Sequence, residues 1–285
     1  MKVSWFRRQQ YVQVRLDQKG EEGALWVKCA GCGDLVFRER VRENQGICPR
    51  CGAYFFLTAQ ERIALLVDEN SFQDVSKPIV AADPLGFVDR QPYVGRLKEA
   101  QQKTGLRNET VVGRARLGGH PVILAVTDFR FIGGSMGSVM GEQLAHAVGM
   151  AAHELWPFIL VTSTGGARMQ EGIFSLMQMV KTVTARRELE RVGVPFISVM
   201  TYPTTGGVLA SIASLGDITI AEKGALIGFA GRRVIEQTTG EKLPAEFQTA
   251  EFAFDHGMVD RVVERRELRS ELVRVLEFFP GGRDR

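Results

Sequence analysis

The chain has 285 residues, of which 45% are hydrophobic and 24% are charged, and its formal net charge is +3. This is an ordinary globular composition, with length enough for a large core and a charge that favours no particular partner. No apolar run approaches the roughly 18 residues of a membrane-spanning helix. The opening MKVSWFRRQQ also lacks the apolar segment of a secretory signal, so we expect a cytoplasmic protein.

After a polar segment, 1–24, that we expect to be flexible, all four cysteines fall within 23 residues, in CAGCG and CPRCG. Two Cys-x-x-Cys pairs with fifteen residues between them are typical of a zinc ribbon, which we place at 25–56. The glycine after each pair tolerates the positive φ that such a turn needs. Four thiolates fill a tetrahedral site and leave no open position, so the predicted zinc is structural. Its ligands are Cys29, Cys32, Cys48 and Cys51.

Two other interpretations of this segment remain open. The cysteines could form two disulfides, although a cytosolic chain disfavours them. The ribbon could also bind nucleic acid through Arg38, Arg40, Arg42 and Arg50. Solvated surface or a docking face is the simpler interpretation of these arginines.

The remaining chain, 57–280, is predicted to be one domain, followed by a short tail at 281–285. Thr58-Ala-Gln-Glu61 is a capping box that begins a helix through Val67. Residues 70–108 form a connecting layer, and VVGRARL and PVILAVTDF form a hairpin around Gly118-Gly119-His120. Further strands are expected at 158–163, 196–201, 217–221, 225–229 and 258–263, and helices at 138–155, 171–191, 207–215, 247–256 and in RRELRSELVRVLEFF. This alternation predicts a layered α/β fold with right-handed crossovers.

A serine motif offers one function. Gly133-Gly134-Ser135-Met136-Gly137 fits G-x-S-x-G, the nucleophile elbow of α/β-hydrolases. A serine esterase also needs an acid and a histidine, and His146 and His153 lie on the helix that begins at the motif. Only Asp217 and His256 remain for those roles, so we keep the esterase as an alternative.

Two glycine pairs suggest a different chemistry. Gly165-Gly166 and Gly206-Gly207 each follow an apolar strand and precede a helix. A peptide N–H at such an exit can donate to an oxygen that gains negative charge, and glycine lets a substrate approach closely. We therefore predict backbone oxyanion donors here, with simple tight turns as the alternative. No histidine, cysteine or paired carboxylate stands near either pair, which suggests that the base comes with the substrate.

The ribbon, FRFIGGSMGSVMGEQ, TSTGGARMQEGIFSLMQM, PTTGGVLAS and ALIGFAGRRVIEQT together closely resemble the carboxyltransferase β subunits of bacterial and plastid acetyl-CoA carboxylases. The resemblance runs from about Trp26 to Phe278, and Arg232 departs from the Pro or Lys common in bacterial relatives. It implies a crotonase-like (ClpP/crotonase) spiral of ββα units with the zinc ribbon at its N-terminus. It also implies transfer of a carboxyl group from carboxybiotin to acetyl-CoA, giving malonyl-CoA in the first committed step of fatty acid synthesis.

The same resemblance implies partners and site residues. The chain lacks a Met-Lys-Met biotin attachment sequence and a G-x-x-x-x-G-K-[ST] loop for ATP, so biotin should arrive on a carrier protein and ATP be used by a biotin carboxylase component. An α subunit should complete the site in an α2β2 heterotetramer. Gly206-Gly207 is then the first candidate for the oxyanion hole, with Gly165-Gly166 lining the same cleft. Residues expected near CoA are Gly133, Gly134, Ser135, Gly137, Arg232 and Arg233.

Overall fold

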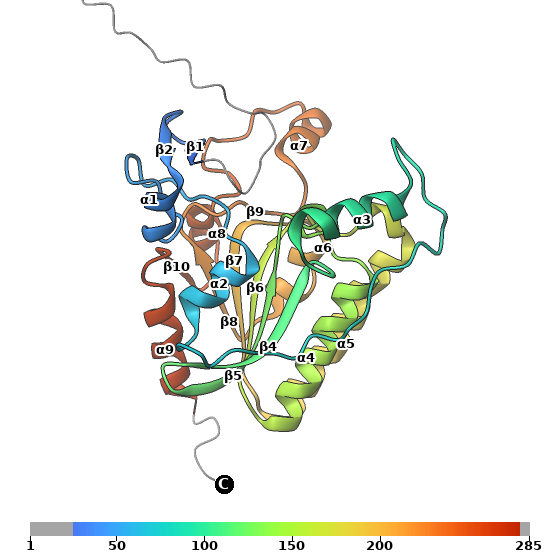
Figure 1. Cartoon of the computed structure of the whole chain (residues 1–285), viewed down its shortest axis with the longest axis vertical. Helices are drawn as coiled ribbons and strands as arrows, with labels where there is room; N and C mark the ends of the chain where they lie inside the picture. The colour runs from blue at the N-terminus through green and yellow to red at the C-terminus, as the bar shows by residue number, and fades with distance from the viewer. Residues whose placement is uncertain (1–24, 280–285) are drawn as a thin grey trace, which may run out of the picture. The chain divides into compact units, whose positions relative to one another are not determined.

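The computed structural model describes residues 25–279 (Figure 1). The predicted N-terminal segment and C-terminal tail therefore lie outside the described residues. Two compact units divide between Phe55 and Phe56, one residue before the boundary expected from the sequence. No helix within 25–279 is long and apolar enough to cross a membrane.

The first unit is a small ribbon. Strands β1 (Trp26–Lys28) and β2 (Leu35–Phe37) pair antiparallel, and helix α1 (Arg38–Glu43) follows. Its buried core contains little more than Cys29, Val36, Val41 and Cys48. So small a core cannot hold a chain of this length folded by apolar burial alone.

The second unit is built on an eight-stranded sheet in the order β10-β8-β7-β6-β5-β4-β3, with β9 paired to β7. Strands β5 to β8 and β10 run parallel, whereas β3 and β4 are antiparallel to their neighbours. The strands are β3 (Gln73–Asp74), β4 (Thr110–Leu117), β5 (His120–Thr127), β6 (Phe158–Thr164), β7 (Phe196–Thr205), β8 (Ile218–Glu222), β9 (Ile227–Gly228) and β10 (Arg261–Val263).

Helices cover both faces of this sheet (Figure 1). On one face α4 (Ser138–Glu154) and α5 (Ile173–Val192) enclose a core with Ile123 and Ala125. On the other, α2 (Ala59–Leu66) and α9 (Leu268–Phe278) enclose a core with Val122 and Leu124. Successive residues of β5 thus enter different cores, which explains its continuous apolar sequence. The remaining elements are α3 (Tyr93–Thr104), η1 (Ile132–Gly134), η2 (Met169–Glu171), α6 (Gly206–Leu209), η3 (Ile212–Leu215), α7 (Arg232–Thr239) and α8 (Ala250–Asp255).

Most predicted elements are present, and the largest differences are in the helices of the second unit. The capping box is confirmed, because the Thr58 hydroxyl accepts from the Glu61 N–H and the Glu61 carboxylate accepts from the Thr58 N–H. The predicted connecting layer contains α3, which begins after Pro92 and ends at Gly105 in the left-handed conformation, both ordinary helix boundaries. The predicted helix at 207–215 is interrupted between α6 and η3, and α7 was not predicted.

A buried cluster of charged side chains lies on the face of the sheet that α2 and α9 cover. The Glu222 carboxylate at the end of β8 accepts from Arg62 of α2 and from Arg265, at 2.6 and 2.9 Å. Burial opposes ionisation of Glu222, but the two guanidinium groups outweigh it and lower its pKa to about 2. The cluster therefore stays charged at neutral pH.

Candidate active site and metal centre

The parallel strands bring the two glycine pairs to the same edge of the sheet. β6 and β7 lie side by side with Thr164 opposite Thr204, so the residues that follow both strands meet. Gly166 and Gly206 both have positive φ, at 105° and 62°. A Cβ on Gly166 would lie 3.1 Å from Gly206 Cα and 3.3 Å from Gly207 N. The two pairs therefore pack backbone to backbone, a contact that only glycine permits.

The serine motif supplies a third loop to this contact. The Gly165 N–H donates to Gly133 O at 2.8 Å, and the Met136 N–H donates to Gly166 O at 2.7 Å. A Cβ on Gly134 would lie 2.2 Å from Ser163 O, so the loop lies directly against the end of β6. We call residues 133–137, 165–168 and 206–207 the glycine junction.

The amides of the junction differ in their hydrogen bonds. Gly165 donates to Gly133 O, and Gly166 donates to Thr164 Oγ1 at 3.0 Å. These two N–H groups are thus engaged within the chain, which disagrees with the donor role predicted for this pair. Gly206 and Gly207 are instead the first residues of α6, whose own hydrogen bonds do not use these N–H groups, and Gly206 directly follows Thr205, which pairs with Gly228 of β9.

Ser135 is not arranged as a nucleophile. Its hydroxyl donates to Ile132 O at 2.7 Å and accepts from Arg168 Nε at 3.1 Å. The expected acid and histidine lie apart as well. Asp217 accepts from Arg186 and from the Phe196 N–H, whereas the His256 ring stacks on Phe252. No catalytic triad forms among these residues, and the esterase interpretation is wrong.

The four cysteines form a second, independent site in the ribbon unit. Their sulfur atoms all lie within 4.8 Å of one another, and Cys29 Sγ is 3.6 Å from Cys51 Sγ. Tetrahedral zinc with Zn–S bonds of about 2.3 Å separates its ligands by about 3.8 Å, so the arrangement fits Zn²⁺. The cysteines are free thiols, which excludes the disulfide alternative.

The two cysteine turns have matching backbones. The Gly33 N–H donates to Cys29 O, the Gly52 N–H donates to Cys48 O, and both glycines have the predicted positive φ, at 76° and 77°. The backbone N–H of Cys32 is the main cause that lowers the pKa of the Cys29 thiol to about 7. The neighbouring sulfur atoms hold the pKa values of the Cys32 and Cys51 thiols above their ordinary value, so Cys29 is the ligand at which the chain favours a thiolate.

Both units match known families. Residues 56–281 match the carboxyl transferase domain, and residues 26–51 match the acetyl-CoA carboxylase zinc finger domain. Relatives named acetyl-coenzyme A carboxylase carboxyl transferase subunit beta include one from Synechococcus sp. (strain WH7803), 49% identical over 96% of this chain and 94% of its own length. Another, from a strain of Thermus thermophilus, is 50% identical over 90% of each chain.

The chain belongs to the carboxyl transferase family. It is therefore a carboxyltransferase, as the sequence predicted. The predicted crotonase-like fold with an N-terminal zinc ribbon is also confirmed.

Solved structures of the family agree with this assignment. A transcarboxylase 12S structure with methylmalonyl-coenzyme A and methylmalonic acid bound superposes with a TM-score of 0.67 at 29% identity. It covers 85% of this chain, which spans 43% of that transcarboxylase chain. A Pseudomonas malonate decarboxylase heterodimer structure superposes with a TM-score of 0.59 at 25% identity, over 80% of this chain and 89% of that one.

The residues expected near CoA in this carboxyltransferase divide into three groups. Gly133 and Gly134 lie in the glycine junction, with positive φ at both. A Cβ on Gly137 would lie 2.3 Å from Glu171 Oε1, so a buried carboxylate already accounts for that glycine. Arg232 and Arg233 begin α7, and their side chains lie outside what the structure describes, so their CoA role stays a prediction.

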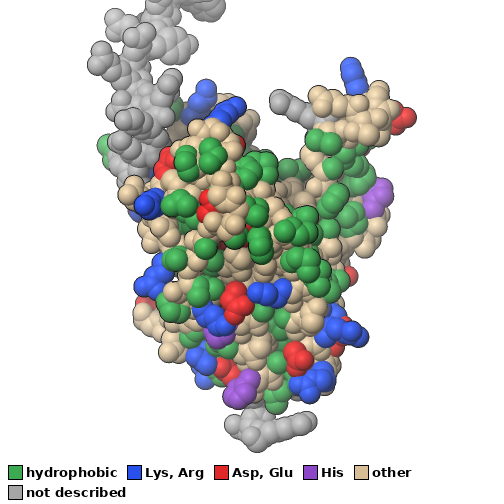
Figure 2. Space-filling model, turned by 90° about the vertical axis from the view of Figure 1, so that its right-hand side faces the viewer, with side chains coloured by type: hydrophobic (Ala, Val, Ile, Leu, Met, Phe, Trp, Pro, Cys, Tyr) green, Lys and Arg blue, Asp and Glu red, His purple; other side chains and the backbone are tan. Residues whose placement is uncertain are grey.

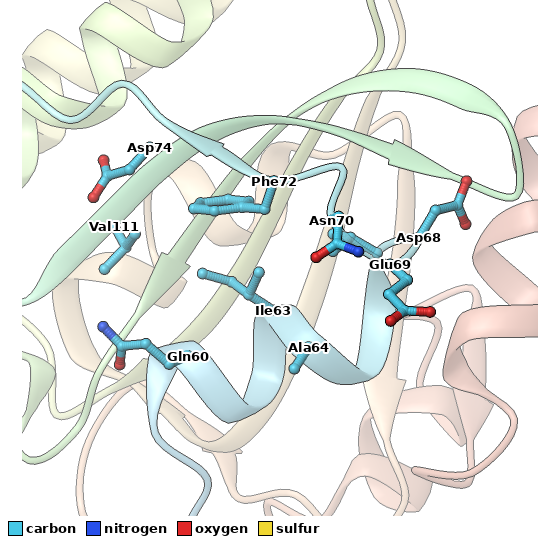
Figure 3. A pocket seen from close by; sticks show the side chains of 10 residues that line it. Gln60, Ile63, Ala64, Asp68, Glu69, Asn70, Phe72, Asp74 and Val111 are labelled. Atoms are coloured by element: carbon cyan, nitrogen blue, oxygen red, sulfur yellow. The ribbon is translucent and has the colours of Figure 1, made fainter.

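A pocket of about 470 Å³ lies elsewhere, between α2, β3 and β4 (Figure 3). Ile63, Phe72 and Val111 line it with apolar surface, and Asp68 and Asp74 add carboxylates. None of its lining residues belongs to the glycine junction. It is therefore separate from the candidate active site.

Side chains beneath the junction were missed from the sequence. Arg168, Glu109 and Tyr93 are fully buried there, and Glu171 is almost so. The sequence signals for this group are the position of Arg168, two residues after a glycine pair, and that of Glu171, a carboxylate at the start of the predicted helix 171–191.

Proposed function

We propose that the chain is the β subunit of the carboxyltransferase of a cytoplasmic acetyl-CoA carboxylase, and that it transfers a carboxyl group to acetyl-CoA. The observation that supports this most is the glycine junction. Its three loops meet through their backbones. The residues 133–137, 165–168 and 206–207 include no histidine, cysteine or carboxylate that could act as an acid or a base. Such a site suits a reaction whose proton acceptor enters with a substrate.

Each part of the junction has a proposed role. Biotin, delivered on a carrier protein, supplies the carboxyl group and the base that takes a proton from the acetyl methyl group. The Gly206 and Gly207 N–H groups stabilise the negative oxygen that this proton transfer creates, and losing one such donor raises a barrier by roughly 3–4 kcal/mol. Gly133 and Gly134 allow CoA to approach the backbone closely.

The surface of α5 supports the proposed α subunit as partner. The buried side of this helix carries polar residues, which is the reverse of the usual arrangement. Ser175, Gln178 and Thr182 face the interior and are buried. Apolar side chains on its other side are exposed, and Figure 2 shows hydrophobic side chains gathered on the side of the molecule that carries α5. We call them, together with Met169 of η2, the α5 stripe; the members on α5 are Ile173, Phe174, Leu176, Met177, Val180 and Val183.

A continuous apolar stripe of this kind marks a protein interface. It begins at Met169, directly after the glycine junction, and Met179 Sδ would lie 2.8 Å from a Cβ on Gly207. The partner that covers the stripe therefore sits beside the site. We propose that this partner is the α subunit, in an α2β2 assembly that also receives the biotin carboxyl carrier protein and works with a biotin carboxylase component.

The function is tested by the reverse half-reaction. Malonyl-CoA-dependent carboxylation of free biotin is measured with the purified chain, with the α subunit, and with both. We expect activity only in the mixture, because the site is completed by the partner. A lone chain as active as the mixture would contradict the shared site, and an inactive mixture would contradict the function.

The α5 stripe is tested by Met177→Glu. A charge in the centre of an apolar interface is desolvated without a partner, so we expect the Kd for the α subunit to rise at least about tenfold, or about 1.4 kcal/mol. Titration calorimetry measures the Kd. Ser270→Glu places the same carboxylate on α9, which covers the opposite face of the sheet, and should leave the Kd unchanged. Equal Kd values for both variants would place the partner elsewhere.

A further inference from the structure

The side chain that holds the glycine junction together is Arg168. Its guanidinium is 0% exposed, as is the Glu109 carboxylate beside it. Burying an arginine is expensive unless its charge and all its donors are matched. A position that keeps one so close to the proposed site therefore requires a physical reason.

The guanidinium contacts three other segments of the chain, at Ser135, Glu109 and Tyr93. Its Nε donates to Ser135 Oγ at 3.1 Å, and its Nη2 donates to Ser135 O at 2.7 Å. The same Nη2 lies 2.8 Å from Glu109 Oε2, facing it as an ion pair rather than as an aligned hydrogen bond. On the other side Nη1 donates to the Tyr93 hydroxyl at 3.1 Å. Only a planar group with five donors can make this set of contacts, so lysine is no substitute.

Glu171 extends the cluster to the start of α4. Its Oε1 accepts from the Tyr93 hydroxyl at 2.7 Å, and its Oε2 accepts from the Ser138 N–H at 2.6 Å. Ser138 is the first residue of the 17-residue helix α4, whose N-terminus carries partial positive charge. The carboxylate thus takes the place of a missing side-chain cap, and Gly137 leaves the room for it.

The pKa values of Arg168 and Tyr93 favour the protonation states that these hydrogen bonds require. Burial by itself would lower the pKa of Arg168, but the charge of Glu109 and the hydrogen bonds raise that pKa above its ordinary value. Burial also raises the pKa of Tyr93, which keeps its hydroxyl a donor. Arg168 therefore stays charged and Tyr93 keeps its proton at neutral pH.

These contacts connect the loops whose relative placement the proposed reaction needs. Arg168 holds loop 133–137 through Ser135, and its own N–H donates to Met136 O at 2.9 Å. Gly166, two residues earlier in the same loop, rests against Gly206 and Gly207. A shift of Arg168 would therefore move both the proposed CoA loop and the proposed oxyanion donors.

We propose that Arg168, together with Tyr93 and Glu171, is a positioning group for carboxyl transfer that locks the three loops of the glycine junction in register. This rests on the proposed function. The group touches neither substrate nor carrier; it acts by preorganising backbone donors, whose misplacement by about 1 Å can lower a rate about a hundredfold. Its loss should thus lower kcat beyond any effect on stability.

The test uses the complex with the α subunit and the malonyl-CoA and free biotin assay. We expect Arg168→Lys to lower kcat by at least about tenfold, and Tyr93→Phe by about threefold or more, with the KM for biotin unchanged. Arg62→Lys is the matched control, because it makes the same change in the buried cluster around Glu222. It should lower Tm and leave kcat as in the wild type.

The outcomes separate positioning from plain stability. If folded Arg168→Lys keeps the wild-type kcat and only its Tm falls, as for Arg62→Lys, the proposal is wrong. If Arg168→Lys does not fold, Tyr93→Phe decides: reduced kcat at unchanged Tm supports the proposal, and wild-type kcat overturns it. Activity of the wild-type complex in the same assay shows separately whether the proposed function holds.

Discussion

Replacing Gly166 with alanine should reduce kcat for carboxyl transfer by at least about a hundredfold in the complex with the α subunit. The added Cβ would lie 3.1 Å from Gly206 Cα, 3.3 Å from Gly207 N and 3.3 Å from Thr205 O. All three are backbone atoms, which cannot rotate away as a side chain can. The loop carrying Gly206 and Gly207 must therefore move, and its amides leave the position in which we propose that they stabilise the oxyanion. Steady-state kinetics of the purified variant complex measure the effect.

The matched control is Gly193→Ala at the end of α5. Gly193 also has positive φ, at 68°, but a Cβ there meets nothing within 4 Å. Gly193→Ala carries the left-handed strain of about 1–2 kcal/mol. Gly166→Ala also places alanine at positive φ, and it alone adds the backbone clash. Gly193→Ala should therefore lower Tm slightly with kcat unchanged. A Gly166→Ala complex with wild-type kcat would show that the close packing of the two glycine pairs is irrelevant to the reaction.

The parts of the fold that can be predicted from the sequence are those that depend on local patterns of residues. β5 and β6 contain the apolar runs PVILAV and FILV, and the β4–β5 hairpin turns at Gly118 and Gly119, both with positive φ. The two glycine pairs were recognised because each directly follows such a strand. Their contact with each other follows from the parallel pairing of β6 and β7, which a local pattern does not specify.

The third loop of the junction was found through a motif that also offered a serine esterase as an alternative. G-x-S-x-G describes a spacing, and the same spacing occurs where glycines accommodate neighbouring backbone and a carboxylate. Gly134 lies against Ser163 O and Gly137 against Glu171, contacts between residues about thirty positions apart. A motif match carries no information about what fills the space beside each glycine.

The burial of charged side chains is the feature that was hardest to predict from the sequence. Arg168 and Glu171 look like ordinary surface residues in GGARMQEG, and their partner Tyr93 lies in a segment assigned to a connecting layer. On α5 the apolar positions would normally be taken for the interior face, yet Ser175 and Thr182 are the buried ones. In both places the deciding contacts are made with distant segments, and on α5 we propose with a second protein.

Removing the zinc should unfold the ribbon, 25–55, and leave the larger unit folded. The ribbon's core is limited to a few side chains, two of which are the metal ligands Cys29 and Cys48. Structural zinc contributes apparent binding free energies of about 10–16 kcal/mol in small zinc domains, far more than this core can supply. Trp26 reports on the change, because its ring packs edge-on against Phe37 with centroids 5.6 Å apart.

The measurement is the Trp26 contribution to fluorescence, obtained by subtracting the spectrum of Trp26→Phe from that of the unchanged chain before and after a chelator removes the metal. We expect a red shift to solvent-exposed emission that reverses when Zn²⁺ is restored. The thermal transition of the larger unit should persist, because its sheet is covered on both faces by helices and contains no cysteine. An unchanged Trp26 spectrum in chain shown by metal analysis to be zinc-free would mean that the four thiols do not hold the ribbon together.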